Sequence, residues 1–508
     1  MEMHVQHTSF MPETLCGVCR SQISVEGDVI IPGSLRESAD VLHASAMAVV
    51  ERAESMQGRV SIGGRVVFTV LYSRGEKGTP ASIEAAADFT QLCELPGAVP
   101  RAEVFATAWV EQVEAHAQSG RMSMRAVVGL CARAMGCEAA EAVSGIDLPG
   151  VQMRTSQLRF RRRVGWGSKE ILLREEFLLP AELAVTDTLG ARAAVAFHDT
   201  AGGQGRIGLS GEVTIEAVHA SDVPGKPIVT TRYTVPVSQS VEMSGESGEV
   251  LDGRIVVKDI AVASQENGNG ERVLRAEVLL GLSAWAEREE NISLLTDAYA
   301  TSGDDLRLNH VSMTIRTGDH RTSVAESGKA ALMLPAGAKP VRTMLAAFAN
   351  PVLKRFAQQG NRLVAEGKLD TTLLYLSDEG TTVSAQVEAP FRTAFAAEAA
   401  PEDILLLDAS SVEAVPITSD RVELRYILHA QVEGVRAEQV SIATEAEAVP
   451  ASAVTRDIVL YYAQPGETAW DIARRYRIPE EELRALNPGL NGEPKAGQGL
   501  VVWHRADL

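Results

Sequence analysis

A repeat with a period of roughly 150 residues constrains the fold of this chain more than any other feature of its sequence. Each copy holds an apolar triplet closed by proline, then a glycine that opens an apolar segment, and finally a second apolar segment. The prolines are Pro32, Pro180 and Pro335, the glycines are Gly64, Gly211 and Gly367, and the closing segments are 126–134, 277–286 and 424–432. A ring residue follows each glycine at the same distance, as Tyr72, His219 and Tyr375. A period of this length is the size of a domain, so the sequence predicts three tandem homologous domains.

Apolar and polar residues alternate along much of each copy. In the second copy Val213, Ile215 and Ala217 alternate with glutamate and threonine, and the segment from 421 onward behaves similarly. Alternation of period two is typical of antiparallel strands with one buried face. The alanine-rich segment 43–56 could instead form a helix. The sequence therefore predicts a mainly β protein of three tandem β-rich, sandwich-like domains, with room for one helix in each.

The predicted domain boundaries follow from the repeat and from changes in composition. The β-rich repeat domains are expected at residues 12–140, 155–295 and 310–445, and a small C-terminal domain at 456–505. The candidate linkers between them are residues 141–150, 296–309 and 441–454.

Composition excludes several classes of protein. The 508 residues include 67 acidic and 48 basic side chains, which give a net charge of −19. This negative charge disfavours binding to nucleic acid. No stretch approaches the roughly 20 apolar residues of a transmembrane helix. The N-terminal segment lacks the pattern of a signal peptide. The odd number of cysteines, 5, suits a reducing cytosol better than a disulfide framework. We expect the protein to stay in the compartment where it is made.

The last 50 or so residues change character and predict a compact strand, helix, helix, strand module. Thr468 and Asp471 approximate a capping box at the start of a helix whose apolar face carries Ile472 and Tyr476. Pro479 suits the first turn of a second helix.

This module resembles the LysM family. The matching residues are Tyr461, Gly466, Thr468, Trp470, Ile472, Ala473, Tyr476, Asn487, Pro488, Gly497, Gln498 and Leu500. The departures are Ala463, Glu467 and Ala469, where the family has Val, Asp and Leu, together with a missing Leu before Gly497. The resemblance implies binding to N-acetylglucosamine glycans such as peptidoglycan, in a groove between two loops. The implied walls are Gly466, Glu467, Thr468 and Ala469 on one side and Asn487, Pro488, Gly489 and Leu490 on the other.

Two interpretations of this module stay open. Trp470, Ile472, Tyr476, Leu483 and Leu486 are expected in its core and not in contact with sugar. The altered loop residues could weaken glycan binding or mark a module adapted to a protein partner.

Tandem domains of this pattern followed by one LysM domain resemble the SipL-like family of clostridial spore-coat morphogenetic proteins. The resemblance implies binding to the stage IV ATPase that forms the basement layer of the coat around the forespore. It also implies a place in the mother-cell cytosol, at the forespore surface and spore coat. We therefore expect a non-catalytic structural and interaction protein that docks this ATPase through its LysM and repeat domains. The alternative is a peptidoglycan-binding protein of the cell wall or spore cortex.

Other motifs give no sign of catalysis, and we expect no cofactor and no metal. Residues 203–208 spell GxGxxG but precede a strand, so they indicate a hairpin turn. Cys16 and Cys19 lack further ligands, and ordinary packing is favoured over a redox pair. The basic cluster at 159–163 is expected on a strand with Phe160 inward and its neighbours solvated.

Overall fold

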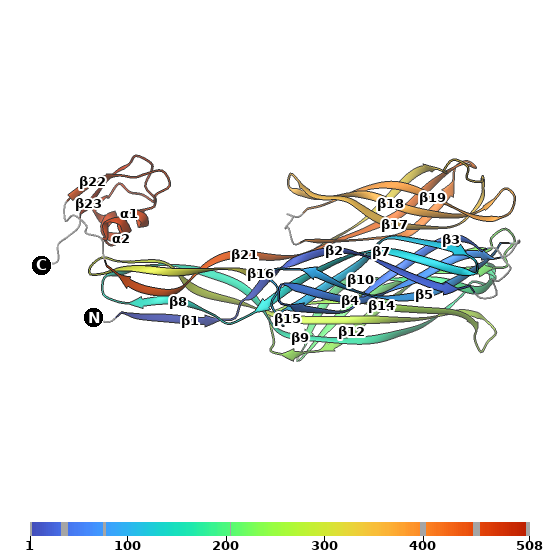
Figure 1. The fold of residues 1–508 in the computed structure, drawn as a ribbon, viewed down its shortest axis with the longest axis horizontal. Coiled ribbons are helices and arrows are strands. Elements are labelled where there is room, and N and C mark those ends of the chain that lie inside the picture. The colour runs from blue at the N-terminus through green and yellow to red at the C-terminus, as the bar shows by residue number, and fades with distance from the viewer. Residues whose placement is uncertain are drawn as a thin grey trace.

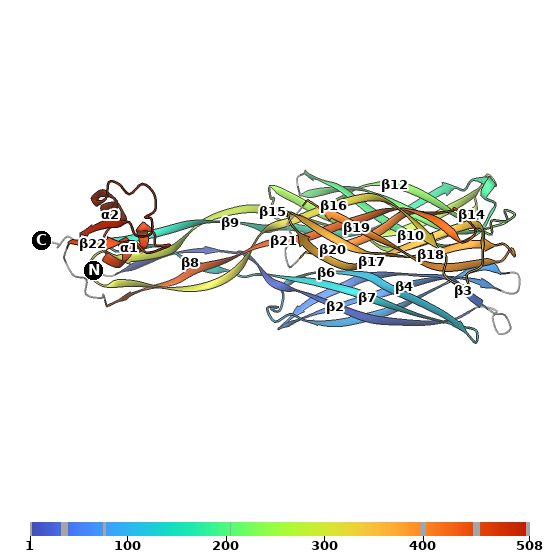
Figure 2. The ribbon, with the colours of Figure 1, turned by 90° about the horizontal axis from the view of Figure 1, so that it is seen from above.

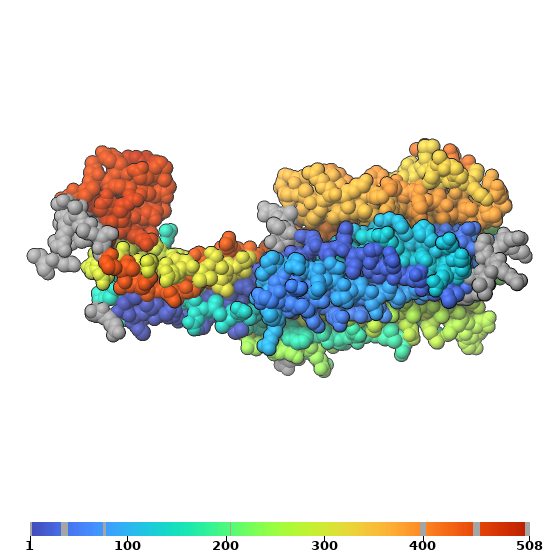
Figure 3. Space-filling view, in the orientation of Figure 1, coloured from blue at the N-terminus to red at the C-terminus, as the bar shows by residue number. Residues whose placement is uncertain are grey.

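The structure is a computed structural model, and it describes residues 3–31, 39–74, 78–203, 205–396, 403–450 and 458–503. It is an elongated molecule in which a broad body of strands narrows into a stalk (Figure 1). A small helical module lies beside the end of the stalk, apart from the body (Figure 3), and the N-terminal strand lies at that same end. Pro32 lies outside the described residues.

The first repeat forms a sandwich of two antiparallel sheets. Its strands are β2 (Glu13–Ile30), β3 (Ala39–Met56), β4 (Arg59–Arg74), β5 (Thr79–Glu94), β6 (Glu103–Gln118) and β7 (Arg121–Cys137). One sheet has the order β3-β4-β5, and β6, β7 and β2 pair in the other. Buried apolar residues of β4 and β7, among them Phe68 and Leu130, form the core between the sheets.

The other two repeats have the same strand order. The second consists of β9 (Val151–Leu178), β10 (Val185–Gly203), β11 (Arg206–Ser221), β12 (Ile228–Glu242), β14 (Val250–Glu266) and β15 (Arg272–Ala300), with β13 (Ser244–Gly245) added beside β9. The third consists of β16 (Asp305–Met333), β17 (Val341–Gln359), β18 (Arg362–Ser377), β19 (Thr382–Phe395), β20 (Ile404–Pro416) and β21 (Arg421–Val449). The mainly β, sandwich-like repeats are confirmed. Residues 203 and 206 pair across the β10–β11 hairpin, as predicted for the GxGxxG segment.

The three sandwiches lie side by side in the body, around a common long axis (Figures 1 and 2). Two antiparallel strand pairs extend from the body into the stalk, namely β9 with β15 and β16 with β21. A third pair in the stalk consists of β1 (His4–Phe10) and β8 (Ala140–Asp147). The core of the stalk contains residues from all three of these strand pairs, including Phe10, Leu158, Leu294 and Ile442. The predicted linkers are therefore wrong over most of their described length, because residues 141–147, 296–300, 305–309 and 441–449 belong to strands. Residues 451–454 of the third predicted linker lie outside the described residues.

The helical alternative for residues 43–56 is also wrong, because this segment belongs to β3. Its register with β4 runs from Ala39–Arg74 to Met56–Arg59. The helix propensity of alanine amounts to less than about 1 kcal/mol per residue, so pairing along the whole length of β4 outweighs it. In the described part of the repeats, the one helical segment is the single turn Ala181–Leu183.

The repeated glycines are explained by a bulge in the neighbouring strand. Each glycine lies opposite the residue before an irregularity in β3, β10 or β17. A Cβ at Gly64 would lie 2.1 Å from the carbonyl oxygen of Val49, and one at Gly367 would lie 2.2 Å from that of Val352. Because these contacts are with backbone atoms, only glycine fits.

A second bulge in the same strands brings the three repeats together. The bulged residues are Leu42, Leu189 and Leu345, at equivalent positions of β3, β10 and β17. All three belong to one apolar cluster, which we call the leucine plug, together with Leu71, Val218 and Leu374. A bulge redirects a side chain that regular pairing would place elsewhere. The plug therefore joins the repeats where regular strands would leave them separate.

A buried group of charges joins the repeats again where the body meets the stalk, and we call it the waist cluster. Arg316 is fully buried and donates to Glu13 over 2.9 Å and to Asp319 over 2.8 Å, and it also pairs with Glu287. Glu13 belongs to the first repeat, Glu287 to the second and Arg316 to the third. Arg163 joins this cluster through Asp319 at 3.4 Å.

The prediction for the basic cluster at 159–163 is confirmed for Phe160 and Arg159 but wrong for Arg163. Phe160 is buried, and Arg159 is exposed. Arg163 is largely buried, and its guanidinium lies 4.4 Å from the ring centre of Phe105 and 5.0 Å from that of Trp285. Strand alternation could not foresee this burial, because the neighbouring repeats cover the polar face of β9.

The ring residue of the second repeat predicts a loss of stability in acid. His219 is fully buried and bonded to Thr188 and Thr231, and burial lowers its pKa from 6.5 to about 4. Between these two values the unfolded chain binds a proton that the folded chain does not. We therefore expect His219 to reduce the free energy of unfolding by up to roughly 1.4 kcal/mol per pH unit as the pH falls through this window. Urea titrations from pH 7 to pH 4 should show a shallower pH dependence for His219→Gln, and an unchanged slope would contradict this.

Candidate functional site

The C-terminal module has the predicted order of strand, helix, helix and strand. Its elements are β22 (Ile458–Tyr462), α1 (Ala469–Tyr476), α2 (Glu480–Leu486) and β23 (Gly499–Trp503). Thr468 caps α1 in a reciprocal capping box with Asp471, as the sequence predicts. Trp470, Ile472 and Leu483 are buried in the core, whereas Tyr476 and Leu486 are only half-buried.

In the first predicted wall, residues 466–469, the polar side chain of Glu467 forms its hydrogen bonds and its ion pair with other residues of the module. The Glu467 carboxylate accepts hydrogen bonds from the hydroxyl of Tyr461 at 2.7 Å and the backbone N–H of Gln464 at 2.9 Å, and it pairs with Arg475 at 2.5 Å. The hydrogen bonds from Gln464 and Tyr461 lower the pKa of Glu467, so this side chain is a carboxylate at neutral pH. Gly466 is exposed, and Ala469 is buried.

In the second predicted wall, residues 487–490, the polar side chain of Asn487 is likewise hydrogen-bonded within the module. The Asn487 amide donates to the carbonyls of Leu483 at 2.8 Å and Val501 at 2.7 Å, and it accepts from the Val501 N–H at 2.7 Å. It therefore ties α2 to β23. Pro488 and Gly489 are exposed, and Leu490 is buried in the core.

A side chain outside the predicted walls joins them. The Glu493 carboxylate accepts a hydrogen bond from the backbone N–H of Ala469 at 2.7 Å. Glu493 follows α2 in the chain, so this bond links the second loop to the first. A glycan in this groove would find that the N–H of Ala469 and the side chains of Glu467 and Asn487 already have partners.

The module is held against the end of the stalk. Tyr299 of β15 is fully buried and lies in the core of the module, where its ring meets Trp470 edge-on at 4.9 Å between centres. Its hydroxyl donates to the carbonyl of Ile478 at 2.8 Å. Burial raises the pKa of this phenol, so it stays protonated and can donate.

Polar contacts surround this ring. Asp297 accepts from the indole N–H of Trp470 at 2.7 Å and from Arg474 at 2.7 Å. Arg477 donates to the carbonyls of Ala300 at 2.9 Å and Gly303 at 2.7 Å. These stalk residues fall within the predicted linker 296–309, and nothing in their local pattern distinguishes them from a loop. The stalk thus supplies part of the module's core, and the module is a fixed part of the molecule.

The side of the module formed by β22 carries an exposed apolar row, which we call the β22 row. It consists of Ile458, Leu460 and Tyr462, which are 72%, 58% and 57% exposed. They alternate with less exposed residues along the strand, so they share one face of the two-stranded sheet. Three large apolar side chains in a row are more than the scattered exposed residues of an ordinary surface.

Cys16 and Cys19 have raised thiol pKa values, whereas the reactive thiol of a redox pair has a lowered one. Cys19 is buried, and burial together with neighbouring Cys93 raises its pKa to about 12. Burial also raises the pKa of Cys16. Reactive thiols have lowered pKa values, so packing is the better account of both residues. Among the described residues, no group of three or more His, Cys, Asp or Glu side chains is placed to hold a metal ion.

Two families match parts of this chain. The SipL, SPOCS domain matches residues 39–118, which span β3 to β6, and the LysM domain matches residues 461–503. Both are non-catalytic binding domains, and together they indicate a sporulation-related protein with a domain of the peptidoglycan-binding type. The combination of the two matches is similar to that of a SipL-like protein with a C-terminal LysM domain. No curated protein and no solved structure matches the chain.

The strands equivalent to the matched β3–β6 segment recur in β10–β14 and β17–β20. In the part of the chain that the structure describes, no helix is both long and apolar enough to cross a membrane.

Proposed function

We propose that this protein is a non-catalytic interaction protein of spore-coat assembly, which docks the ATPase of the coat basement layer at the forespore surface. The observation that carries this proposal is the β22 row, an exposed apolar face on a module that is otherwise fixed to the stalk. An apolar face suits a protein partner because its burial removes apolar area from water, whereas sugar recognition also needs polar groups with free hydrogen-bonding capacity. The repeats supply further contacts to the same partner.

The test compares capture of the purified ATPase by full-length protein and by defined variants. Deletion after Val454 and the triple variant Ile458→Ser, Leu460→Ser, Tyr462→Ser should both lose most of the captured ATPase. Leu172→Ser is the matched control, because Leu172 is an exposed apolar residue on β9, 43% exposed and far along the chain from the module. Equal capture by the deletion and the full chain would reject a role for the LysM domain.

A second candidate function is peptidoglycan binding, favoured by the LysM match and by the exposed residues Pro488 and Gly489 of the second wall. A Cβ at Gly489 would meet open space, so Gly489→Trp should fill the groove without disturbing the fold. If glycan binding is the function, the chain sediments with purified peptidoglycan, and Gly489→Trp abolishes this while ATPase capture persists. No sedimentation of the unchanged protein at low salt would reject this function.

A further inference from the structure

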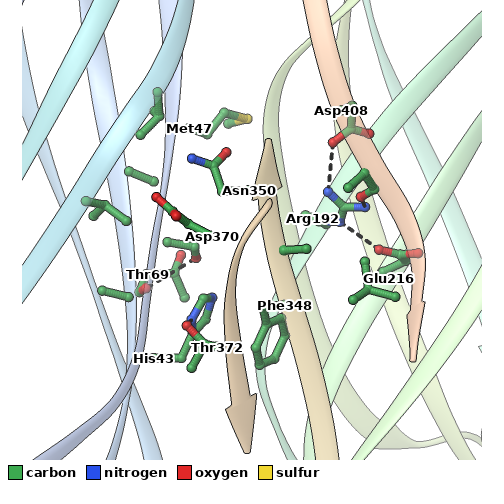
Figure 4. Close-up of a pocket in the computed structure, with 18 of the residues that line it drawn as sticks. His43, Met47, Thr69, Arg192, Glu216, Phe348, Asn350, Asp370, Thr372 and Asp408 are labelled. Atoms are coloured by element: carbon green, nitrogen blue, oxygen red, sulfur yellow. Dashed lines mark hydrogen bonds and ion pairs between the residues drawn. The ribbon is translucent and has the colours of Figure 1, made fainter. Parts of the chain in front are cut away.

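The largest cavity described in the body lies between the three repeats, and polar side chains at its wall are paired with one another (Figure 4). Arg192 donates to Glu216 at 2.6 Å and to Asp408 at 3.0 Å. His43 and Thr372 form a hydrogen bond of 3.0 Å. Groups that already have partners have little capacity left for a ligand or a reaction. The loop that follows α2 in the LysM module differs, because two of its polar groups have no partner.

Three asparagines of this chain are followed by glycine, namely Asn267, Asn269 and Asn491. Asparagine is chemically labile, and most of all before glycine, because glycine has no Cβ to shield its backbone nitrogen from the asparagine side chain. The reaction between the two groups needs a side-chain amide that is free to turn and a glycine nitrogen that is accessible. Hydrogen bonds to either group therefore slow it.

The first two of these pairs lie in the hairpin between β14 and β15, where hydrogen bonds hold them. The side-chain oxygen of Asn267 accepts from the backbone N–H groups of Asn269 and Glu271, each at 2.9 Å. The Asn267 amide also donates to the Glu271 carboxylate at 3.0 Å. The side chain of Asn269 is exposed, but the N–H of the following Gly270 donates to the carbonyl of Asn267 at 3.0 Å. Each of these two sites is therefore restrained at one of its reacting groups.

The third pair, Asn491 and Gly492, has neither restraint. Both residues are exposed, and within the described ranges neither the Asn491 side chain nor the Gly492 N–H forms a hydrogen bond. A Cβ at Gly492 would have no heavy atom within 4 Å, so nothing crowds this peptide unit. The side-chain amide and the glycine nitrogen are both free to react.

We propose that Asn491 is a site of spontaneous deamidation, which places an aspartate or isoaspartate beside the LysM groove. The backbone nitrogen of Gly492 attacks the side-chain carbonyl carbon of Asn491, and a carbon–nitrogen bond forms. The side-chain nitrogen takes up the displaced proton and leaves as ammonia. Water then opens the resulting succinimide at one of its two carbonyl carbons. Opening at the side-chain carbon gives aspartate, and opening at the backbone carbon gives isoaspartate, whose main chain is longer by one methylene group.

The loop is anchored on both sides of this peptide bond, so a longer main chain disturbs the anchors. Leu490 is buried in the core of the module, and the Glu493 carboxylate accepts from the N–H of Ala469 at 2.7 Å. The carbonyl of Gly492 itself accepts from Arg484 at 2.9 Å. The extra methylene group displaces the Glu493 carboxylate, and the new negative charge beside it repels it. Isoaspartate therefore breaks the bond that joins the two walls of the groove and frees the N–H of Ala469.

The experiment incubates the full chain at mildly alkaline pH and follows the three asparagines by mass spectrometry of proteolytic peptides. The folded protein is compared with the same chain in urea. In the folded protein, Asn491 should convert about threefold faster than Asn269 and at least about tenfold faster than Asn267, because one and three hydrogen bonds restrain those sites. In urea this advantage should disappear, because the dipeptide is the same at all three sites. Conversion of Asn491 no faster than that of Asn269 in the folded protein, or an equal advantage in urea, would overturn the proposal.

The effect on the groove is measured by hydrogen exchange at the N–H of Ala469, with Asn491→Ser as the matched control that cannot deamidate. After full conversion, this N–H should exchange at least about tenfold faster than in fresh protein, as expected when a bond to a charged acceptor is lost. Asn491→Ser incubated in the same way should show the exchange of fresh protein. Conversion without faster exchange, or equal acceleration in the control, would overturn the inferred opening of the groove.

Discussion

Replacing Arg316 with methionine is expected to lower the free energy of unfolding by about 3–5 kcal/mol. The guanidinium is fully buried and is the cation that Glu13, Glu287 and Asp319 share. Burial raises the pKa of Glu287 even with the guanidinium present. Burial would also raise the pKa of Asp319, but the hydrogen bond and charge of Arg316 outweigh it and lower that pKa. Without Arg316, three carboxylates from three repeats are left without their shared cation.

The pH dependence distinguishes this effect from a simple loss of packing. The uncompensated carboxylates of Arg316→Met should take up protons more readily than those of the unchanged protein. The loss of stability, measured by urea unfolding, should therefore be larger at pH 8 than at pH 5.

Arg316→Met combined with Glu13→Gln and Glu287→Gln provides the control, because it removes two of the three carboxylates along with the cation, and the third, Asp319, still pairs with Arg163. This triple variant should recover a large part of the loss. A loss below about 1 kcal/mol for the single variant would show that the waist cluster does not hold the repeats together.

Replacing Tyr299 with alanine is expected to release the LysM module from the stalk. Truncation of a buried aromatic side chain costs about 3–5 kcal/mol, and this ring lies in the module's core against Trp470. Because the side chain comes from the stalk and the core from the module, the variant destabilises the contact between the two parts. The body, whose cores do not include Tyr299, should keep its stability.

Hydrogen exchange measured by mass spectrometry can follow this release. Tyr299→Ala should increase exchange in α1 and in β15 residues 296–300, with exchange in β4 and β7 unchanged. Tyr299→Phe is the control, because it keeps the ring and loses only the hydroxyl bond to Ile478, worth about 1 kcal/mol. Exchange in α1 that is unchanged in both variants would mean that the module does not depend on the stalk.

The LysM groove shows how far a motif can predict a site. The sequence identified the module, its capping box at Thr468 and most of its core. The sequence did not indicate that Glu493 joins the two loops, because its partner is a backbone N–H 24 residues earlier in the chain. Asp297 and Tyr299 were missed for the same physical reason, since their partners lie more than 170 residues later.

The repeat by itself determined that the chain contains three similar β-rich units, because its glycines and rings lie opposite the same two bulges in each copy. The sequence could not show how those units assemble. The leucine plug, the waist cluster and the stalk are built from residues of different repeats, and each residue taken alone has the pattern of an ordinary strand or linker. Local periodicity records which face of a strand is buried within its own sandwich. Only the tertiary structure decides what covers the other face, because that depends on contacts between segments hundreds of residues apart.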